Sequence, residues 1–298
     1  VKRGVWQAGG LPLEFPTISL GEVFMKPTSM LYRNLMAMDV EEMIAANPID
    51  GVVLLAGCDK TTPAQLMGAA SVDIPAIMVT GGPQLTARWR GQELGSGTDA
   101  FRLWDAVRSG ELSEEEFLEA ENYFARSAGH CMVMGTASTM AAMAEAMGMT
   151  LPGCACIPAS DSRRLVLAEA SGREIVSMVD DDTRPSKVIT AQALENAIRV
   201  DMAIGGSTNA VVHLLALAGR LGLPLVLDDF DRLSRSTPCI VNLKPSGDRY
   251  MEDLYYAGGI SAVMHEISHL LHLDAVAVNG KSLRDNIAQA EVFDHDVI

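Results

Sequence analysis

Residues 56–63 bring together three side chains that could bind metal ions. They include a thiol at Cys58, a carboxylate at Asp59 and an amine at Lys60. Thiolate is a ligand for iron–sulfur clusters and zinc, whereas carboxylate oxygens suit magnesium and calcium. The residue types therefore permit two different metals side by side. They equally permit a structural role, with Cys58 as a small buried apolar residue, Asp59 as a helix N-cap and Lys60 facing solvent.

The other cysteines give weaker signals. Cys131 lies between glycines ahead of a predicted helix, where a free cysteine is more often part of the core than a ligand. Cys154 and Cys156 form a C-x-C pair that could share a metal in an extended strand, but the flanking prolines and glycine favour a structural loop. Nothing in the sequence around Cys239 indicates a partner for its thiol. Five cysteines in 298 residues do not form a disulfide framework, and this favours a reducing, cytoplasmic compartment.

Glycine-rich turns provide a competing interpretation. Residues 81–83 and 205–209 could each hold an anion at a helix N-terminus. Neither turn matches a P-loop or a dinucleotide-binding fingerprint, so the nucleotide signal is weak. His265, His269 and His272 have helical spacing that could present three imidazoles to zinc. No carboxylate falls on the same face, so we expect these histidines to pack at the surface.

Alternating strands and helices must position these groups. Apolar runs at residues 50–57 and 74–79 predict buried strands, and weaker strand signals occur at 223–227 and 275–278. A helix is predicted to begin at Ser113, where Glu116 completes a capping box. Further helices are predicted at residues 63–70, 136–149, 190–204, 210–221 and 251–271. The last of these is expected to be broken around residues 257–259.

These elements predict an α/β fold with a doubly wound, mostly parallel sheet and helices on both faces. Ligands in such folds bind at the carboxyl ends of the strands. We therefore expect the chemistry to lie after Leu55, after Val79 and ahead of the helix at 207–221.

Composition and charge exclude several classes of protein. The chain is 48% hydrophobic and 20% charged, which excludes intrinsic disorder for most of it. Its longest apolar stretches, at residues 132–149 and 211–227, are interrupted by polar side chains and argue against a membrane protein. A net charge of −15 without a basic patch argues against nucleic acid or an anionic membrane as the partner. An anionic small substrate remains compatible, because a bound cation can oppose the global charge locally.

Several motifs along the chain carry a resemblance when they are taken together. They are residues 9–16, 19–22, 58–64, 129–132, 135–140, 151–153 and 205–210. Over essentially all 298 residues, the chain resembles the dihydroxy-acid dehydratase and 6-phosphogluconate dehydratase family, and within it the sugar-acid (aldonate) branch. The Cys-Asp-Lys-Thr-Thr-Pro run at 58–63 and the Gly-His-Cys-Met run at 129–132 look like this branch rather than the branched-chain amino-acid branch.

The resemblance implies a [2Fe–2S] cluster beside a Mg²⁺ site. Cys58 and Cys131 match two of the three cluster ligands, and Glu22 and Asp59 match Mg²⁺ ligands. Lys60 matches a lysine that is carbamylated by CO₂ and thereby becomes an oxygen ligand suited to Mg²⁺.

The implied reaction removes water from a sugar acid and yields a 2-keto-3-deoxy acid. Mg²⁺ would bind the substrate carboxylate and 2-hydroxyl, and the open iron position would act as a Lewis acid for the departing 3-hydroxyl. His130, Ser207 and Thr208 are candidates for contacting the substrate. Relatives form homo-oligomers, and the resemblance implies the same here.

We expect residues 1–298 to be a single cluster- and Mg²⁺-binding domain, truncated at both ends. The family's third cluster cysteine and its C-terminal β-barrel domain, which supplies a serine base, would lie outside this chain, so we expect the chain alone to be inactive. Two alternatives stay open: the dihydroxy-acid dehydratase of branched-chain amino-acid synthesis, and a non-catalytic α/β module that binds an anion. The deciding geometry is a Cys58–Cys131 sulfur separation within roughly 7 Å, with the three Mg²⁺ candidates converging beside it.

Overall fold

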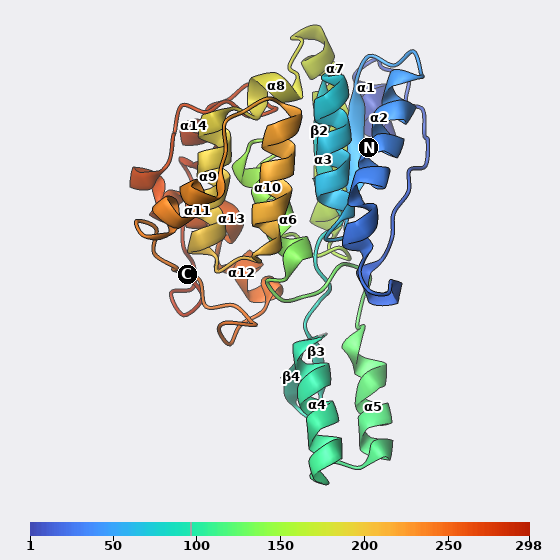
Figure 1. The fold of residues 1–298 in the computed structure, drawn as a ribbon, viewed down its shortest axis with the longest axis vertical. Helices are drawn as coiled ribbons and strands as arrows, with labels where there is room; N and C mark the ends of the chain where they lie inside the picture. Colours follow the sequence, from blue (N-terminus) through green and yellow to red (C-terminus); the bar gives the residue numbers. More distant parts are fainter. Residues whose placement is uncertain (96) are drawn as a thin grey trace.

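The computed structural model describes residues 1–95 and 97–298, and it is rich in helices (Figure 1). In chain order, the elements are α1 (Lys2–Gln7), the 3₁₀ turns η1 (Glu22–Phe24) and η2 (Ser29–Tyr32), α2 (Arg33–Ala45), β1 (Val52–Ala56), α3 (Thr61–Val72), β2 (Ala76–Thr80), β3 (Ala87–Trp89), β4 (Gln92–Leu94), α4 (Thr98–Ser109), α5 (Glu114–Phe124), α6 (Thr136–Ala146), α7 (Ser162–Asp180), α8 (Pro185–Val188), α9 (Ala191–Ala203), α10 (Asn209–Arg220), α11 (Leu227–Ser234), α12 (Met251–Ala257), α13 (Gly259–Glu266), η3 (Ser268–Leu270) and α14 (Leu283–Ile287).

Strands β1 and β2 pair in parallel, with Val52 opposite Ala76 and Ala56 opposite Thr80. Every residue of β2 is buried, which explains its continuous apolar run. Helices α3 and α7 both pack against the two strands. A Cβ atom on Gly57 would lie 3.7 Å from the Cα of Gly81, so the turns that follow the two strands lie side by side. The sheet thus brings two predicted ligand-binding turns together at its carboxyl edge.

The doubly wound sheet expected from the sequence is not confirmed. Among the described residues, the parallel sheet consists of β1 and β2 alone. Beyond β2, the Met78 amide donates to the Met149 carbonyl at 2.8 Å, and the Val278 amide donates to the Gly148 carbonyl at 2.8 Å. Further segments therefore attach to the sheet through single hydrogen bonds instead of forming full strands. The chain is a helix-rich α/β domain with a small parallel sheet.

Both of the weaker strand predictions, at residues 223–227 and 275–278, are wrong. Residues 223–226 have no regular structure and lead directly into α11, because the Asp229 carboxylate accepts a hydrogen bond from the Val226 amide at 3.1 Å and caps the helix. Val276 forms only an isolated bridge with Ser282. The other element predictions fare better: the break in the 251–271 helix lies between α12 and α13, and the capping box at Ser113 is present.

The strands β3 and β4 and the helices α4 and α5 form an arm that extends away from the rest of the chain (Figure 1). A small hydrophobic cluster at its base includes Trp89, Leu94 and Met132, separate from the main core. The Tyr250 hydroxyl, from the start of α12, donates to the buried Asp99 carboxylate of α4 at 2.9 Å. This bond and the cluster attach the arm to the body. Of the helices in the described part of the chain, none is long and apolar enough to cross a membrane.

Candidate functional site

Lys60 is buried, and its ammonium lies between two carboxylates. The Nζ atom is 2.8 Å from Asp59 Oδ2 and 3.3 Å from Glu22 Oε2, and the residue is 4% exposed. Burial alone would lower the pKa of Lys60, but the hydrogen bonds and charges of Asp59 and Glu22 outweigh it and raise that pKa above its ordinary value. Lys60 itself occupies the N-cap position of α3. The structural alternative, in which Lys60 faces solvent and Asp59 caps the helix, is therefore wrong.

Glu22 reaches this centre from η1, a separate segment of the chain. Its Oε2 atom accepts hydrogen bonds from the Ser29 amide at 3.0 Å and from the Ser29 hydroxyl. Burial raises the pKa of Glu22, but the bonds from Ser29 and Thr28 and the charge of Lys60 outweigh it and lower that pKa to about 2. The carboxylate is therefore ionised and fixed in position at neutral pH.

The donor set around Lys60 fits a hard divalent cation. Glu22 and Asp59 direct oxygen atoms at a single positively charged atom, the arrangement that Mg²⁺ prefers. The described residues contain no group of three or more His, Cys, Asp or Glu side chains that could hold a metal ion. A third protein ligand from these residues would therefore have to be a side chain of another type. Lys60 is the side chain that lies between the two carboxylates.

Cys58 lies next to this centre, in the turn that follows β1. It is partly buried, and its thiol donates to Asp59 Oδ1 at 3.2 Å. Burial raises the pKa of the Cys58 thiol, and the neighbouring Asp59 charge raises it further. A thiolate at this position therefore needs a cation beside it.

Cys131 lies in the loop between α5 and α6, which is held against the turn after β2. The His130 amide donates to the Gly82 carbonyl at 3.0 Å, and the Gln84 amide donates to the His130 carbonyl at 2.9 Å. Because the turns after β1 and β2 are neighbours, Cys58 and Cys131 belong to segments at the same edge of the sheet. Both predicted cluster residues are thus on the side where an α/β fold binds ligands.

The candidate substrate residues differ in their surroundings. His130 is nine-tenths buried, its Nδ1 lies 3.1 Å from the Cys131 carbonyl, and burial lowers its pKa to about 4. The Ser207 and Thr136 hydroxyls are 2.8 Å apart, which ties the 205–209 turn to the start of α6, shortly after Cys131. Thr208 is exposed at the N-cap of α10. His130 therefore lies in the Cys131 loop itself, and Ser207 lies in a turn that contacts the helix after that loop.

Sequence reasoning missed three polar residues around this centre. Ser29, which holds Glu22, is fully buried. Arg33, the first residue of α2, donates from Nη1 to His213 Nδ1 at 3.1 Å and to the Val212 carbonyl at 3.2 Å. The interruption of an apolar helix by His213 was the one available sign of this pair.

The remaining candidates have structural surroundings. Cys154 and Cys156 are buried in a turn, as expected, where the Glu145 carboxylate accepts the amides of Gly153 and Ala155 at 2.9 and 2.8 Å. The three-histidine pattern does not form one helical face, because α13 ends at Glu266. His265 and His269 are exposed, and His272 lies 3.4 Å from Glu195, so the expected packing at the surface is confirmed.

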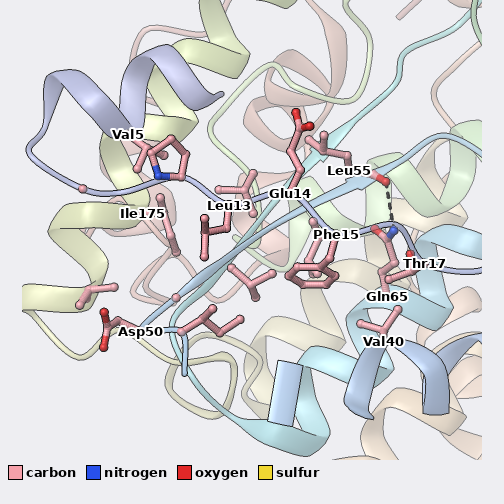
Figure 2. A pocket seen from close by; sticks show the side chains of 18 of the residues that line it. Val5, Leu13, Glu14, Phe15, Thr17, Val40, Asp50, Leu55, Gln65 and Ile175 are labelled. Atoms are coloured by element: carbon pink, nitrogen blue, oxygen red, sulfur yellow. Dashed lines mark hydrogen bonds between the residues drawn. The ribbon is translucent and has the colours of Figure 1, made fainter. Parts of the chain in front are cut away.

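A cavity of 680 Å³ runs along β1 and ends near the candidate centre. Figure 2 shows Leu13, Phe15 and Ile175 along it, and the Gln65 amide donating to the Leu55 carbonyl at 3.0 Å. Near the centre it is lined by Ser19, Gly57 and Thr61. The mostly apolar lining does not match a polyhydroxylated acid, so the Lys60 centre is the better candidate for chemistry on such a molecule.

Comparison with known proteins identifies the relatives of this chain. A family model described as dihydroxy-acid/6-phosphogluconate dehydratase, N-terminal, matches residues 1–286. An L-arabonate dehydratase of Azospirillum brasilense is 56% identical over 301 residues, and an L-arabinonate dehydratase of Rhizobium leguminosarum bv. trifolii is 55% identical over 300 residues; each alignment covers 100% of this chain and 52% of the relative. A dihydroxy-acid dehydratase of Caldicellulosiruptor saccharolyticus is 42% identical over 308 residues, covering 100% of this chain and 55% of that protein. The chain thus spans about half the length of the curated relatives it matches.

Proposed function

The chain belongs to the dihydroxy-acid/6-phosphogluconate dehydratase family, and we propose from this that its protein is a sugar-acid dehydratase. The reaction removes the 3-hydroxyl and the C2 proton of an aldonate as water, and the enol product tautomerises to a 2-keto-3-deoxy acid. The observation that carries the proposal is the convergence of Glu22 and Asp59 on the buried amine of Lys60. The higher identity to L-arabonate and L-arabinonate dehydratases than to a dihydroxy-acid dehydratase supports the sugar-acid branch.

Dehydratases of this family depend on metal, and the residues present fit two groups. Glu22, Asp59 and a carbamylated Lys60 would hold Mg²⁺, while Cys58 and Cys131 would supply two thiolates to a [2Fe–2S] cluster. When bound, Mg²⁺ acidifies the C2 proton of the substrate, and the cluster acts as a Lewis acid toward the leaving hydroxyl.

The residues of this chain prepare the centre for that chemistry. Ser29 keeps the Glu22 carboxylate ionised and oriented, so it is ready to accept a cation. Lys60 must lose its proton before its nitrogen can add to CO₂, and the two carboxylates oppose this loss by raising the pKa of the amine. His130 and Ser207 are proposed to orient the hydroxyl groups of the substrate. We further propose that the protein is cytoplasmic and assembles as a homo-oligomer.

The test is an assay of the complete protein, purified without oxygen, on a panel of aldonates and on dihydroxyisovalerate. We expect dehydration of at least one aldonate, together with iron and acid-labile sulfide in the purified protein. Activity on dihydroxyisovalerate without activity on aldonates would replace this proposal with the branched-chain enzyme. Anion binding without iron, sulfide or dehydration would identify a non-catalytic module instead.

A further inference from the structure

His213 carries a buried hydrogen-bond donor that has no partner among the described residues. The residue is 0% exposed, and its Nδ1 atom lies 3.1 Å from Arg33 Nη1. Because arginine can only donate, Nδ1 accepts, and the ring proton of the neutral imidazole must be on Nε2. No described residue accepts a hydrogen bond from that nitrogen. A buried N–H group without an acceptor is destabilising, so this one calls for an explanation.

His213 belongs to α10, which packs against α3, and α3 begins immediately after Lys60. The charges of Lys60 and Asp59 both act on the His213 ring. Burial, together with the charges of Arg33 and Lys60, lowers the pKa of His213 to about 4, although the Asp59 charge opposes the shift. The imidazole is therefore neutral at physiological pH, and it lies within the electrostatic field of Lys60 and Asp59.

Among the residues that the structure describes, Arg33 also has no acidic partner within ion-pair distance. It is 8% exposed, and its hydrogen-bond acceptors in the described part of the chain are the Val212 carbonyl, the His213 ring and, at 3.4 Å, the Asn34 side chain. A buried cation normally has an anion nearby. Conversion of Lys60 from ammonium to carbamate would supply additional negative charge to the same region of the molecule.

We propose that His213 is a positioning residue that donates its Nε2 hydrogen to an oxygen of the carbamate formed on Lys60. This inference rests on the proposed function. The ammonium of Lys60 loses one proton to water, and the freed lone pair forms a bond to the carbon of CO₂ while one C–O π pair moves onto oxygen. The nitrogen then loses a second proton to water. The product carries two oxygens that are absent from the amine. One of them gives His213 its missing acceptor, and the nearby Arg33 charge stabilises the negative product.

Two amide variants distinguish the roles of the two ring nitrogens of His213. His213→Asn places an amide near the position of Nδ1, so it keeps an acceptor for Arg33 but removes the donor toward Lys60. His213→Gln extends an amide nitrogen to the position of Nε2 and restores the donor. His265→Asn is the matched control, because His265 is exposed on the surface.

The experiment uses the complete protein incubated with isotope-labelled bicarbonate and Mg²⁺. Carbamate is measured by the carbon NMR resonance of the labelled adduct, Mg²⁺ affinity by titration calorimetry, and folding by circular dichroism. For His213→Asn we expect reduced carbamate and Mg²⁺ affinity lower by about 10- to 100-fold. His213→Gln should recover most of both, and His265→Asn should match wild type.

Wild-type levels of carbamate and Mg²⁺ affinity in a folded His213→Asn protein would overturn the role of His213 and leave the dehydratase proposal intact. A wild-type protein that forms no carbamate and binds no Mg²⁺ would overturn both. Should His213→Asn fail to fold, wild-type protein with nitrogen-labelled histidine decides the matter. A shift of the His213 Nε2 resonance on addition of bicarbonate supports the bond, and an unchanged resonance overturns it.

Discussion

The Glu22 carboxylate lies 3.3 Å from the buried ammonium of Lys60, although α2 and β1 separate the two residues in the sequence. Neither residue would be in place without the elements between them. Strand β1 delivers Lys60 to the edge of the sheet, and Ser29, just ahead of α2, fixes Glu22. The centre is therefore a product of the fold rather than of one local motif.

Replacing Lys60 by arginine keeps the positive charge at this position but removes the amine that can react with CO₂. Lys60→Arg keeps a cation between Glu22 and Asp59, so the protein should fold, but guanidinium does not form a carbamate. We expect Mg²⁺ affinity and dehydration rate to fall by at least about 100-fold. Calorimetry and a dehydration assay measure the two effects. Lys187→Arg, at an exposed ion pair with Asp182, should leave both unchanged. Full activity in Lys60→Arg would contradict a carbamate ligand.

The two proposed cluster cysteines, which are partly buried, should behave differently from the exposed Cys239. Cys58→Ser and Cys131→Ser should each reduce bound iron and sulfide severely, because serine is a poor ligand for an iron–sulfur cluster. Cys239→Ser is the control, since Cys239 is exposed and lies on a different segment. Iron and sulfide are measured in protein purified without oxygen. Equal retention of iron in all three variants would rule out these cluster ligands.

Ser29→Ala should weaken the hold on Glu22. The variant loses the hydroxyl bond but keeps the amide bond, so we expect a loss of about 0.5–1.5 kcal/mol in the free energy of unfolding at pH 7. Because the pKa of Glu22 is lowered in the folded state, its stabilising effect is present above the unfolded pKa and is lost as pH falls toward about 2.

The loss caused by Ser29→Ala should therefore shrink between pH 7 and pH 3. Urea unfolding at both pH values measures it, with Ser109→Ala on the surface of α4 as the control. An equal loss at both pH values would mean that the hydroxyl acts independently of the Glu22 charge.

We expect Asp201 to lower the free energy of unfolding as the pH rises from 4 to 7. Burial raises its pKa to about 7, and its Oδ1 has no hydrogen-bond partner among the described residues. The folded state therefore holds a proton that the unfolded state releases near pH 4, and the penalty grows between pH 4 and pH 7. Asp201→Asn should raise the free energy of unfolding by about 1–3 kcal/mol at pH 8 and change it little at pH 4.

Thermal or urea unfolding at pH 4 and pH 8 tests this prediction. Asp248→Asn, at an exposed position, is the control. A variant that is no more stable than wild type at pH 8 would show that the carboxylate is solvated in the folded protein.

Tyr250→Phe should loosen the arm. The Tyr250 hydroxyl donates to Asp99 and accepts from Lys244 Nζ at 2.7 Å, so its removal leaves a buried carboxylate with one donor fewer. We expect the free energy of unfolding to fall by about 1–3 kcal/mol and amide hydrogen exchange in α4 and α5 to become faster. Tyr256→Phe, at an exposed position, is the control. Unchanged exchange in the arm would mean that the remaining contacts, the hydrophobic cluster and the Lys244–Asp99 ion pair, are enough to hold it.

Local signals in the sequence predicted the elements better than the partners of the side chains. The turn that carries Cys58, Asp59 and Lys60 was recognisable because an apolar run ends and a helix begins around it. The burial of Lys60 was not, since it depends on Glu22 from a separate segment. The Arg33–His213 bond joins positions 180 residues apart, and no periodic pattern encodes such a pair.

The missed features of the sheet have a related cause. The apolar residues at 223–227 and 275–278 satisfied a strand pattern, but apolar side chains can pack against a core from irregular backbone as well. A cap at Asp229 and single hydrogen bonds beyond β2 decided the outcome, and both depend on contacts that a run of hydrophobic residues does not specify.

The small cluster at the base of the arm gives the arm a mechanical connection to the candidate site. Met132 and Val133 belong to that cluster and directly follow Cys131 in the chain. The arm and the loop that carries this cysteine therefore share one packed cluster, from which the helices α4 and α5 extend (Figure 1). A change in how the arm packs on this cluster would act on the backbone next to Cys131.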